Sequence, residues 1–397
     1  MPAPVNPLVA ATVPPPVMEA RRWLKDIRPD PERPLLNVSQ AAPAAPPPEG
    51  LRQAIADAAL RQDSAHLYGP VLGLPELREA LAEHWSHLYG GTVGPGQVAI
   101  TPGCNQAFVA AMATLARSGE EIILPSPWYF NHKMWLDMQG VRAVPLITGN
   151  TLLPDPEQAR ALITPKTRAI VLVTPNNPGG VEYPARLLSA FAELCRAHNI
   201  ALVLDETYRD FLGHDGRPHD LLADPDWHDT VIVLYSFSKA YRLTGHRVGA
   251  IIASGARLAE AEKFLDTVAI CPAQLGQHGA LWGIRHLGDW LRGERAEMLR
   301  RREAIAGGFR RLNGWTLLGC GAYFAYAEHP FTAPSDVLAR ALVREAGVLL
   351  LPGTMFMPET DPAGGRQVRI AFANIGEERI DELFRRLAAL APARTSA

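Results

Sequence analysis

The chain has 397 residues, of which 47% are hydrophobic and 20% charged, a composition that excludes disordered, collagenous and coiled-coil proteins. Lysine and arginine number 39 against 41 aspartate and glutamate residues, so the net charge of −2 does not favour binding to nucleic acid or to a membrane surface. The four cysteines are widely spaced without a CxxC pair, and no apolar run approaches the roughly 20 residues that cross a bilayer. The amino terminus also lacks the pattern of a signal peptide, so we expect a soluble, cytoplasmic protein.

The first fifty residues are rich in proline, with runs at Pro14–Pro16 and Pro46–Pro48. Proline lacks a backbone N–H and has a fixed φ angle, so it favours extended chain. We therefore interpret residues 1–50 as an extended arm, with a short helix around Val17–Asp26 between the two proline runs, lying against a smaller domain or a partner subunit.

From Leu51 onward, helical periodicity begins, and short aliphatic runs then alternate with helix-length segments. These runs are Val98–Thr101, Glu121–Leu124, Ala143–Leu146, Ala169–Val173, Ala201–Leu204, Val231–Tyr235 and Val248–Ala253. Most are apolar at consecutive positions, which is typical of strands buried on both faces of a largely parallel sheet. The pattern predicts an α/β large domain of about seven strands over residues 51–294. A charged, helix-prone segment after residue 287 leads into a smaller α+β domain, expected over residues 295–397.

Polar clusters follow three of these aliphatic runs, at the strand ends where open α/β sheets bind ligands. The run Ala169–Val173 leads to Asn177 in TPNNPGG, and Ala201–Leu204 leads to Asp205 and Tyr208 in DETY. The third run leads through Ser236 and Ser238 to Lys239, with Arg247 eight residues later.

The chemistry of these clusters matches one cofactor. Two serine hydroxyls and the Arg247 guanidinium make a site for a phosphate or carboxylate. The segment TPGCNQA, after the run Val98–Thr101, begins a predicted helix whose free N–H groups favour a phosphate as well. Asp205 offers an anion and Lys239 an amine. Pyridoxal 5′-phosphate (PLP) fits this set, because lysine forms a Schiff base with its aldehyde and a carboxylate keeps its pyridine nitrogen protonated.

The segment SFSKAYRLTGHRVG resembles the lysine signature of the class I/II aminotransferases, which are fold type I PLP enzymes. TPNNPGG, DETY and HLYGPVLGLPELREALA are similar to three further elements of that family, and the matches run in order from Tyr68 to Arg369. The chain departs from the family at Thr174 and Gly179, where asparagine and threonine are usual. It also carries Ala41 in SQAAP, where relatives usually have glycine, and Arg242 at a usually small position, which adds a second charge near the site.

The resemblance implies a role for each matching residue. Lys239 would form the internal aldimine and then move the proton between Cα and the cofactor, Asp205 would pair with the pyridine nitrogen, and Asn177 and Tyr208 would hydrogen-bond the ring 3′-oxygen. The implied phosphate ligands are Ser236, Ser238, Arg247, the helix start at Gly103, Cys104 and Asn105, and Tyr68 of the neighbouring subunit. Tyr129 would stack on the cofactor ring, with Trp128 as the competing aromatic residue. Arg369 would clamp the substrate carboxylate, and Asn177, Ala41 and Tyr129 would line the substrate side.

The function that the resemblance implies is transfer of an amino group between an L-amino acid and a 2-oxo acid, through PLP and by a ping-pong mechanism, in a homodimer with shared active sites. A C–S lyase, decarboxylase or oxidase of the same fold stays open, because these enzymes differ in pocket shape rather than in the shared residues.

A PLP-binding transcription factor is disfavoured, since about fifty residues are too few for a DNA-binding domain and linker. The histidines show no metal-ligand spacing. No second arginine can be assigned to a side-chain carboxylate, which favours neutral or aromatic amino acids as substrates.

Overall fold

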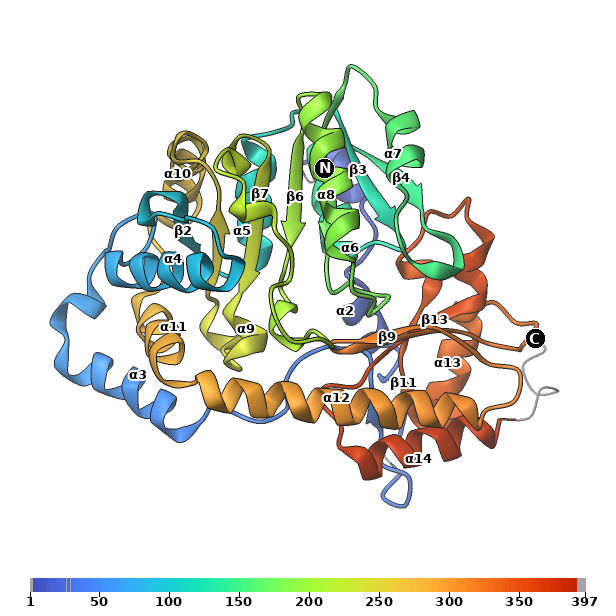
Figure 1. The fold of residues 1–397 in the computed structure, drawn as a ribbon. Helices are drawn as coiled ribbons and strands as arrows, with labels where there is room; N and C mark the ends of the chain where they lie inside the picture. The colour runs from blue at the N-terminus through green and yellow to red at the C-terminus, as the bar shows by residue number, and fades with distance from the viewer. Residues whose placement is uncertain (1–2, 26, 29, 391–397) are drawn as a thin grey trace.

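Two main β-sheets organise the chain in the computed structural model, which describes residues 3–25, 27–28 and 30–390 (Figure 1). A seven-stranded sheet has the order β2-β8-β7-β6-β5-β3-β4, and a four-stranded sheet has the order β12-β13-β10-β9. Within the described ranges, no helix is both long and apolar enough to pass through a bilayer.

The seven predicted strands all belong to the larger sheet. Their bounds are β2 (Val98–Thr101), β3 (Glu121–Ser126), β4 (Arg142–Ile147), β5 (Thr167–Val173), β6 (Ala201–Asp205), β7 (Val231–Ser236) and β8 (Gly249–Ile252). Strand β8 is antiparallel to both of its neighbours, β7 and β2, whereas β7, β6, β5, β3 and β4 pair in parallel. The predicted α/β fold with a mostly parallel sheet is confirmed.

Helices cover both faces of this sheet, which explains why its strands are apolar at consecutive positions. One face packs against α4 (Pro75–Tyr89), α8 (Ala185–Ala197) and α11 (Gln274–His286), and the other against α5 (Cys104–Ala113), α6 (Phe130–Gln139) and α10 (Gly255–Ala269). Adjacent residues such as Val171 and Leu172 lie in opposite layers and are both buried. Each such side chain contributes about 1.5–3 kcal/mol through burial. Two further helices, α3 (Glu49–Arg61) and α7 (Pro156–Leu162), flank this body.

The four-stranded sheet is antiparallel and has its own hydrophobic core. Its strands are β9 (Thr316–Gly321), β10 (Phe324–Glu328), β12 (Leu351–Pro352) and β13 (Gln367–Ala371), and its helices are α13 (Ser335–Ala346) and α14 (Glu377–Ala388). The long helix α12 (Gly288–Arg310) runs from the helices of the larger sheet to this second unit (Figure 1). This helix corresponds to the charged segment expected from the sequence.

The short helix expected around Val17–Asp26 is confirmed as α2, which ends at Arg22, whereas position 26 lies outside the described residues. The chain ahead of it, expected to be extended, forms a further helix. Residues Pro7–Ala11 form α1 and Pro16–Arg22 form α2, and each helix has a proline in its first turn, where the missing N–H costs no hydrogen bond. Further along, β1 (Leu36–Asn37) pairs in parallel with β11 (Val348–Leu349). Proline here starts helices instead of preventing them, and α2 contributes a wall of the site described below.

Candidate active site

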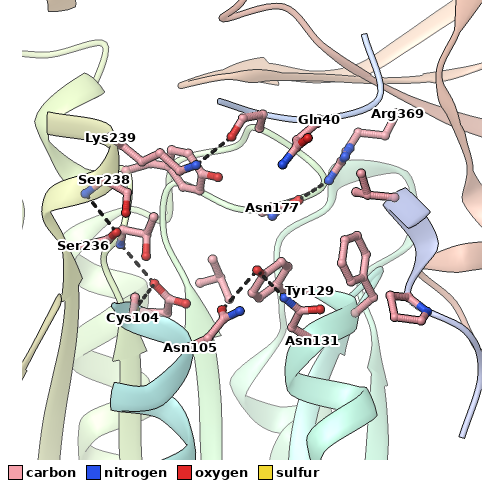
Figure 2. A pocket seen from close by; sticks show the side chains of 18 of the residues that line it. Gln40, Cys104, Asn105, Tyr129, Asn131, Asn177, Ser236, Ser238, Lys239 and Arg369 are labelled. Carbon is pink, nitrogen blue, oxygen red and sulfur yellow. Dashed lines mark hydrogen bonds between the residues drawn. The ribbon is translucent and has the colours of Figure 1, made fainter. Parts of the chain in front are cut away.

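A cavity of about 360 Å³ lies at the carboxyl ends of β5, β6 and β7, and β13 and α2 also contribute side chains to its lining (Figure 2). The structure brings together here all the site residues predicted from the sequence except Gly103 and Tyr68. These are Ala41, Cys104, Asn105, Tyr129, Asn177, Asp205, Tyr208, Ser236, Ser238, Lys239, Arg247 and Arg369. Gly103 immediately precedes α5, whose first residues line the cavity.

Lys239 lies in α9 (Phe237–Ala240), a single turn that follows β7. Its Nζ donates a hydrogen bond to the carbonyl oxygen of Ala41 at 2.6 Å, and points into the cavity (Figure 2). Burial, together with the nearby cations Arg247 and Arg369, lowers the pKa of this amine to about 8. A larger fraction of Lys239 is therefore neutral, and nucleophilic, near physiological pH than of an exposed lysine.

Asp205 ends β6 and is buried at the floor of the cavity. Its Oδ1 accepts a hydrogen bond from the backbone N–H of Thr207 at 3.0 Å, and its Oδ2 lies 3.2 Å from Nε2 of His132. Burial by itself raises the pKa of Asp205, but the hydrogen bonds from His132 and Thr207 outweigh it and hold the pKa below its ordinary value. The site thus contains a permanent carboxylate that can pair with a protonated ring nitrogen.

The start of α5 and the end of β7 form an anion cradle. Arg247 Nη1 donates to the carbonyl of Thr244 at 3.0 Å and to Ser238 Oγ at 3.4 Å, and the Ser238 N–H donates to Ser236 Oγ at 3.3 Å. Gly103 has a φ of +83°, and a Cβ at this position would collide with the Arg247 guanidinium. Only glycine therefore lets Arg247 approach the first N–H groups of α5, which have no partners within the helix. This geometry suits a phosphate group.

Arg369 enters from β13 on the opposite side of the cavity. Its Nη1 donates to Asn177 Oδ1 at 3.0 Å and its Nη2 to the carbonyl of Ser39, whereas its buried Nε has no partner among the described residues. The rings of Phe356 and Phe324 lie 4.9 and 5.2 Å from the guanidinium carbon. Burial lowers the pKa of Arg369 to about 10, so it stays charged at neutral pH. A buried cation with a free N–H calls for an anionic ligand.

Tyr129 and Tyr208 line the cavity, whereas Trp128 belongs to the hydrophobic core. Tyr129 lines the cavity, where its hydroxyl donates to Asn105 Oδ1 at 3.2 Å and accepts from Asn131 Nδ2 at 2.8 Å. Trp128 packs instead into the hydrophobic core behind it. Tyr208 is buried against Tyr323 and Phe324, and this burial raises the pKa of its hydroxyl well above the ordinary value.

Two residues lie elsewhere than the cavity. Arg242 does not line it, because its guanidinium pairs with Glu294 of α12 at 2.6 Å and stacks on Trp290. The charge expected near the site is thus accommodated by Glu294 and is not presented to the cavity. Tyr68 is 80% exposed, and in this single chain its side chain lies outside the cavity lining.

Sequence reasoning missed several residues that the fold places in or behind the cavity: Arg21, Gln40, Asn131, Thr207 and His132. For His132 a signal existed, since it follows Tyr129, the residue that caps α6, by only three positions, and its ring lies 4.9 Å from that of Tyr129. For Arg21 no local signal existed, because it precedes Lys239 by more than two hundred residues.

The family model for class I and II aminotransferases matches residues 33–387. The chain belongs to this family. The enzyme is thus a PLP-dependent aminotransferase, and the resemblance seen in its sequence motifs is confirmed.

Relatives of this aminotransferase differ in their named substrates. It is 32% identical to the valine–pyruvate aminotransferase of Mycobacterium tuberculosis, over 90% of this chain and 91% of that protein. It is 30% identical to the aspartate/prephenate aminotransferase of Thermus thermophilus, over 86% and 87% of the two chains. A solved structure of aspartate aminotransferase from Thermus thermophilus with maleate matches this chain at 27% sequence identity and a TM-score of 0.88. The match covers 97% of this chain and 99% of that one.

Proposed function

We propose that this aminotransferase moves an amino group from an L-amino acid to a 2-oxo acid by a ping-pong mechanism in which each substrate reacts in its own half-reaction. The observation that carries the proposal is the meeting of Lys239, Asp205 and Arg369 in one cavity. An amine, a permanent carboxylate and a buried guanidinium have no reason to share a cavity for stability alone.

The described residues fit PLP on their own chemistry. When bound, PLP supplies an aldehyde that condenses with amines and a protonated ring that accepts electrons from the substrate. The cradle of Gly103, Ser236, Ser238 and Arg247 would hold its phosphate, and Asp205 its ring nitrogen. Asn177 and Tyr208 would hydrogen-bond its 3′-oxygen. Tyr129 would contact its ring.

Lys239 would have two tasks. Its amine, with a pKa of about 8, would hold the cofactor aldehyde in the resting enzyme. Once an amino acid takes its place, Nζ is free to accept the proton from the substrate Cα and to deliver it again. The hydrogen bond from Nζ to the carbonyl oxygen of Ala41 places the amine beside the amino-terminal segment.

Arg369 would orient the substrate. Its Nε, which has no partner among the described residues, and one terminal nitrogen can bind a carboxylate through two parallel hydrogen bonds, with Asn177 holding the guanidinium plane. This contact would fix the orientation of the substrate Cα relative to the cofactor, and that orientation decides which bond at Cα breaks.

We also propose a homodimer with shared sites, in the cytoplasm. Tyr68, Leu67 and Leu60 are 80%, 69% and 81% exposed, an unusual grouping of large apolar side chains for a surface that faces water. A partner subunit would cover them and bring Tyr68 to its phosphate site. Within each subunit we propose an arm over residues 1–50, a large domain over 51–294 and a small domain over 295–397, with the last boundary inside α12.

The visible spectrum of the purified holoenzyme tests the reaction. We expect an amino acid alone to convert the cofactor stoichiometrically to its amine form, with one equivalent of 2-oxo acid released, and an added 2-oxo acid to restore the original spectrum. Continuous release of ammonia, carbon dioxide or a thiol without any 2-oxo acid would instead identify an oxidase, decarboxylase or lyase. Lys239→Ala should lose covalent, borohydride-reducible cofactor; retention of it would refute the assignment of Lys239.

A further inference from the structure

Arg242, three residues beyond Lys239, has an unusual backbone conformation. Its φ is +57°, in the left-handed region that residues other than glycine seldom enter. Such a conformation persists only where the surrounding contacts fix it. The Arg242 side chain has contacts of this kind on two sides.

Helix α12 holds the guanidinium of Arg242 on one side. Nε and Nη2 of Arg242 donate three hydrogen bonds to the carboxylate of Glu294, at 2.9, 2.8 and 2.6 Å. The ring of Trp290, one turn earlier in α12, lies 5.3 Å from the guanidinium carbon. Only 22% of the Arg242 side chain and 21% of the Glu294 side chain are exposed. A shielded, two-pronged ion pair holds its geometry better than an exposed one, so the guanidinium is fixed in place.

The remaining nitrogen of Arg242 holds the amino-terminal segment. Nη1 donates to the carbonyl oxygen of Pro46 at 3.3 Å, and Nζ of Lys239 donates to the carbonyl oxygen of Ala41 at 2.6 Å. Residues 41–46 contain no helix or strand. Among the described residues, these two hydrogen bonds are the ones that join residues 41–46 to distant parts of the chain. Both donors belong to one short loop, so the loop that carries the amine also carries the second anchor of this segment.

The segment in turn shields Lys239. Burial is the largest cause of the lowered pKa of this amine, and the carbonyl of Ala41 is in direct contact with it. The charged and titratable groups that face Nζ across the cavity are Arg247, Arg369, Cys104 and Tyr208. Arg242 is not among them, so it can influence the amine only through the position of the segment. Its bond to Pro46 involves no reacting atom and does not depend on what Nζ binds.

We infer that Arg242 is a positioning residue: fixed by Glu294 and Trp290 of α12, it keeps residues 41–46 against Lys239 and so keeps water away from the amine. This inference rests on the proposed function, because it concerns the amine that the proposed reaction uses. The competing explanation is that the pair of Arg242 and Glu294 only stabilises the fold.

The rate at which the apoprotein captures PLP, measured across pH, tests the inference by a readout other than turnover. In Arg242→Met we expect the midpoint of the pH profile to move from about 8 to about 9, because water that reaches Nζ favours its charged form. The rate constant at pH 7 should then fall about tenfold. Glu294→Gln retains the shape of that side chain without its charge, and should move the midpoint in the same direction by a smaller amount. Arg292→Met is the matched control, since Arg292 lies on α12 and pairs with Asp289 of the same helix; its midpoint should stay near 8.

Urea unfolding of each variant separates positioning from folding. If Arg242→Met and Glu294→Gln are folded and both keep a midpoint near 8, the pair only stabilises the fold and the inference is wrong, whatever stability is lost. A shift in Arg292→Met as large as that in Arg242→Met would also overturn it, because the effect would not be specific to the pair. Absence of PLP capture by the wild-type apoprotein would instead reject the proposed function, and the inference with it.

Discussion

The imidazole Nε2 of His132 lies 3.2 Å from Oδ2 of Asp205, and both side chains are buried. A carboxylate only accepts hydrogen bonds, so this nitrogen carries the proton. The ring is held in place by Phe108, which stacks on it with a centroid separation of 3.9 Å and an interplanar angle of 16°. His132 is thus a positioning residue that keeps Asp205 ionised and aimed at the cavity.

Replacing His132 with leucine should weaken PLP binding about tenfold, because Asp205 loses its strongest side-chain donor and its pKa rises. Titration of the apoprotein with PLP, followed by absorbance, measures this change. His132→Gln retains a donor near the position of Nε2 and should recover much of the affinity. If both variants bind PLP like the wild-type protein, His132 has no influence on Asp205.

The rate at which the apoprotein captures PLP should depend on the protonation of Lys239. Its pKa of about 8 lies below the ordinary value of 10.5, and only the neutral amine attacks an aldehyde. We therefore expect the rate constant to rise about tenfold per pH unit below pH 8 and to level off above it. Stopped-flow absorbance between pH 6 and pH 10 provides the measurement. The rate for the reference amine, Nα-acetyl-lysine, should still be rising at pH 10, because the pKa of an exposed lysine is about 10.4. A protein profile that keeps rising to pH 10 would contradict the lowered pKa.

Gly103→Ala should damage the phosphate cradle. The new methyl group would collide with Arg247 at a φ of +83°, a region that only glycine enters easily, so we expect a stability loss of about 1–3 kcal/mol and much weaker PLP binding. Gly293→Ala is a matched control in the interior of α12, where an added Cβ meets nothing within 4 Å. It should stabilise the protein by about 0.5–1 kcal/mol. Urea unfolding and PLP titration of both variants provide the measurements. If Gly103→Ala is as stable as Gly293→Ala and binds PLP as tightly, the proposed role of Gly103 is wrong.

The exposed apolar group around Tyr68 should be buried between subunits. Leu67→Glu would place a charge in that interface, and we expect the variant to sediment as a monomer with greatly reduced activity, because each site would lose the partner's Tyr68. Val337→Glu, on α13 and 38% exposed, is the control and should remain dimeric. Sedimentation velocity distinguishes the two. A wild-type monomer, or a dimer that tolerates Leu67→Glu, would contradict the proposed interface.

The features that could be predicted from the sequence are those that depend on residues close together in the chain. The seven strands follow from short apolar runs, because a strand buried on both faces needs no polar alternation and each run records this locally. Lys239, Ser236 and Ser238 follow one strand directly, so their placement at a strand end needed no knowledge of distant contacts. The same holds for Asp205 in DETY.

Only the tertiary structure decided how distant segments meet. Arg242 sits inside the lysine signature, yet Glu294 draws it away from the cavity. Ala41 and Lys239, far apart in the chain, are joined by a hydrogen bond to a backbone carbonyl, which no side-chain pattern encodes. Arg21 belongs to a proline-rich segment that looked like a linker and became a wall of the cavity. Hydrophobic periodicity reports which face of an element is buried, but not which remote element covers it, and that pairing is settled by packing of the whole chain.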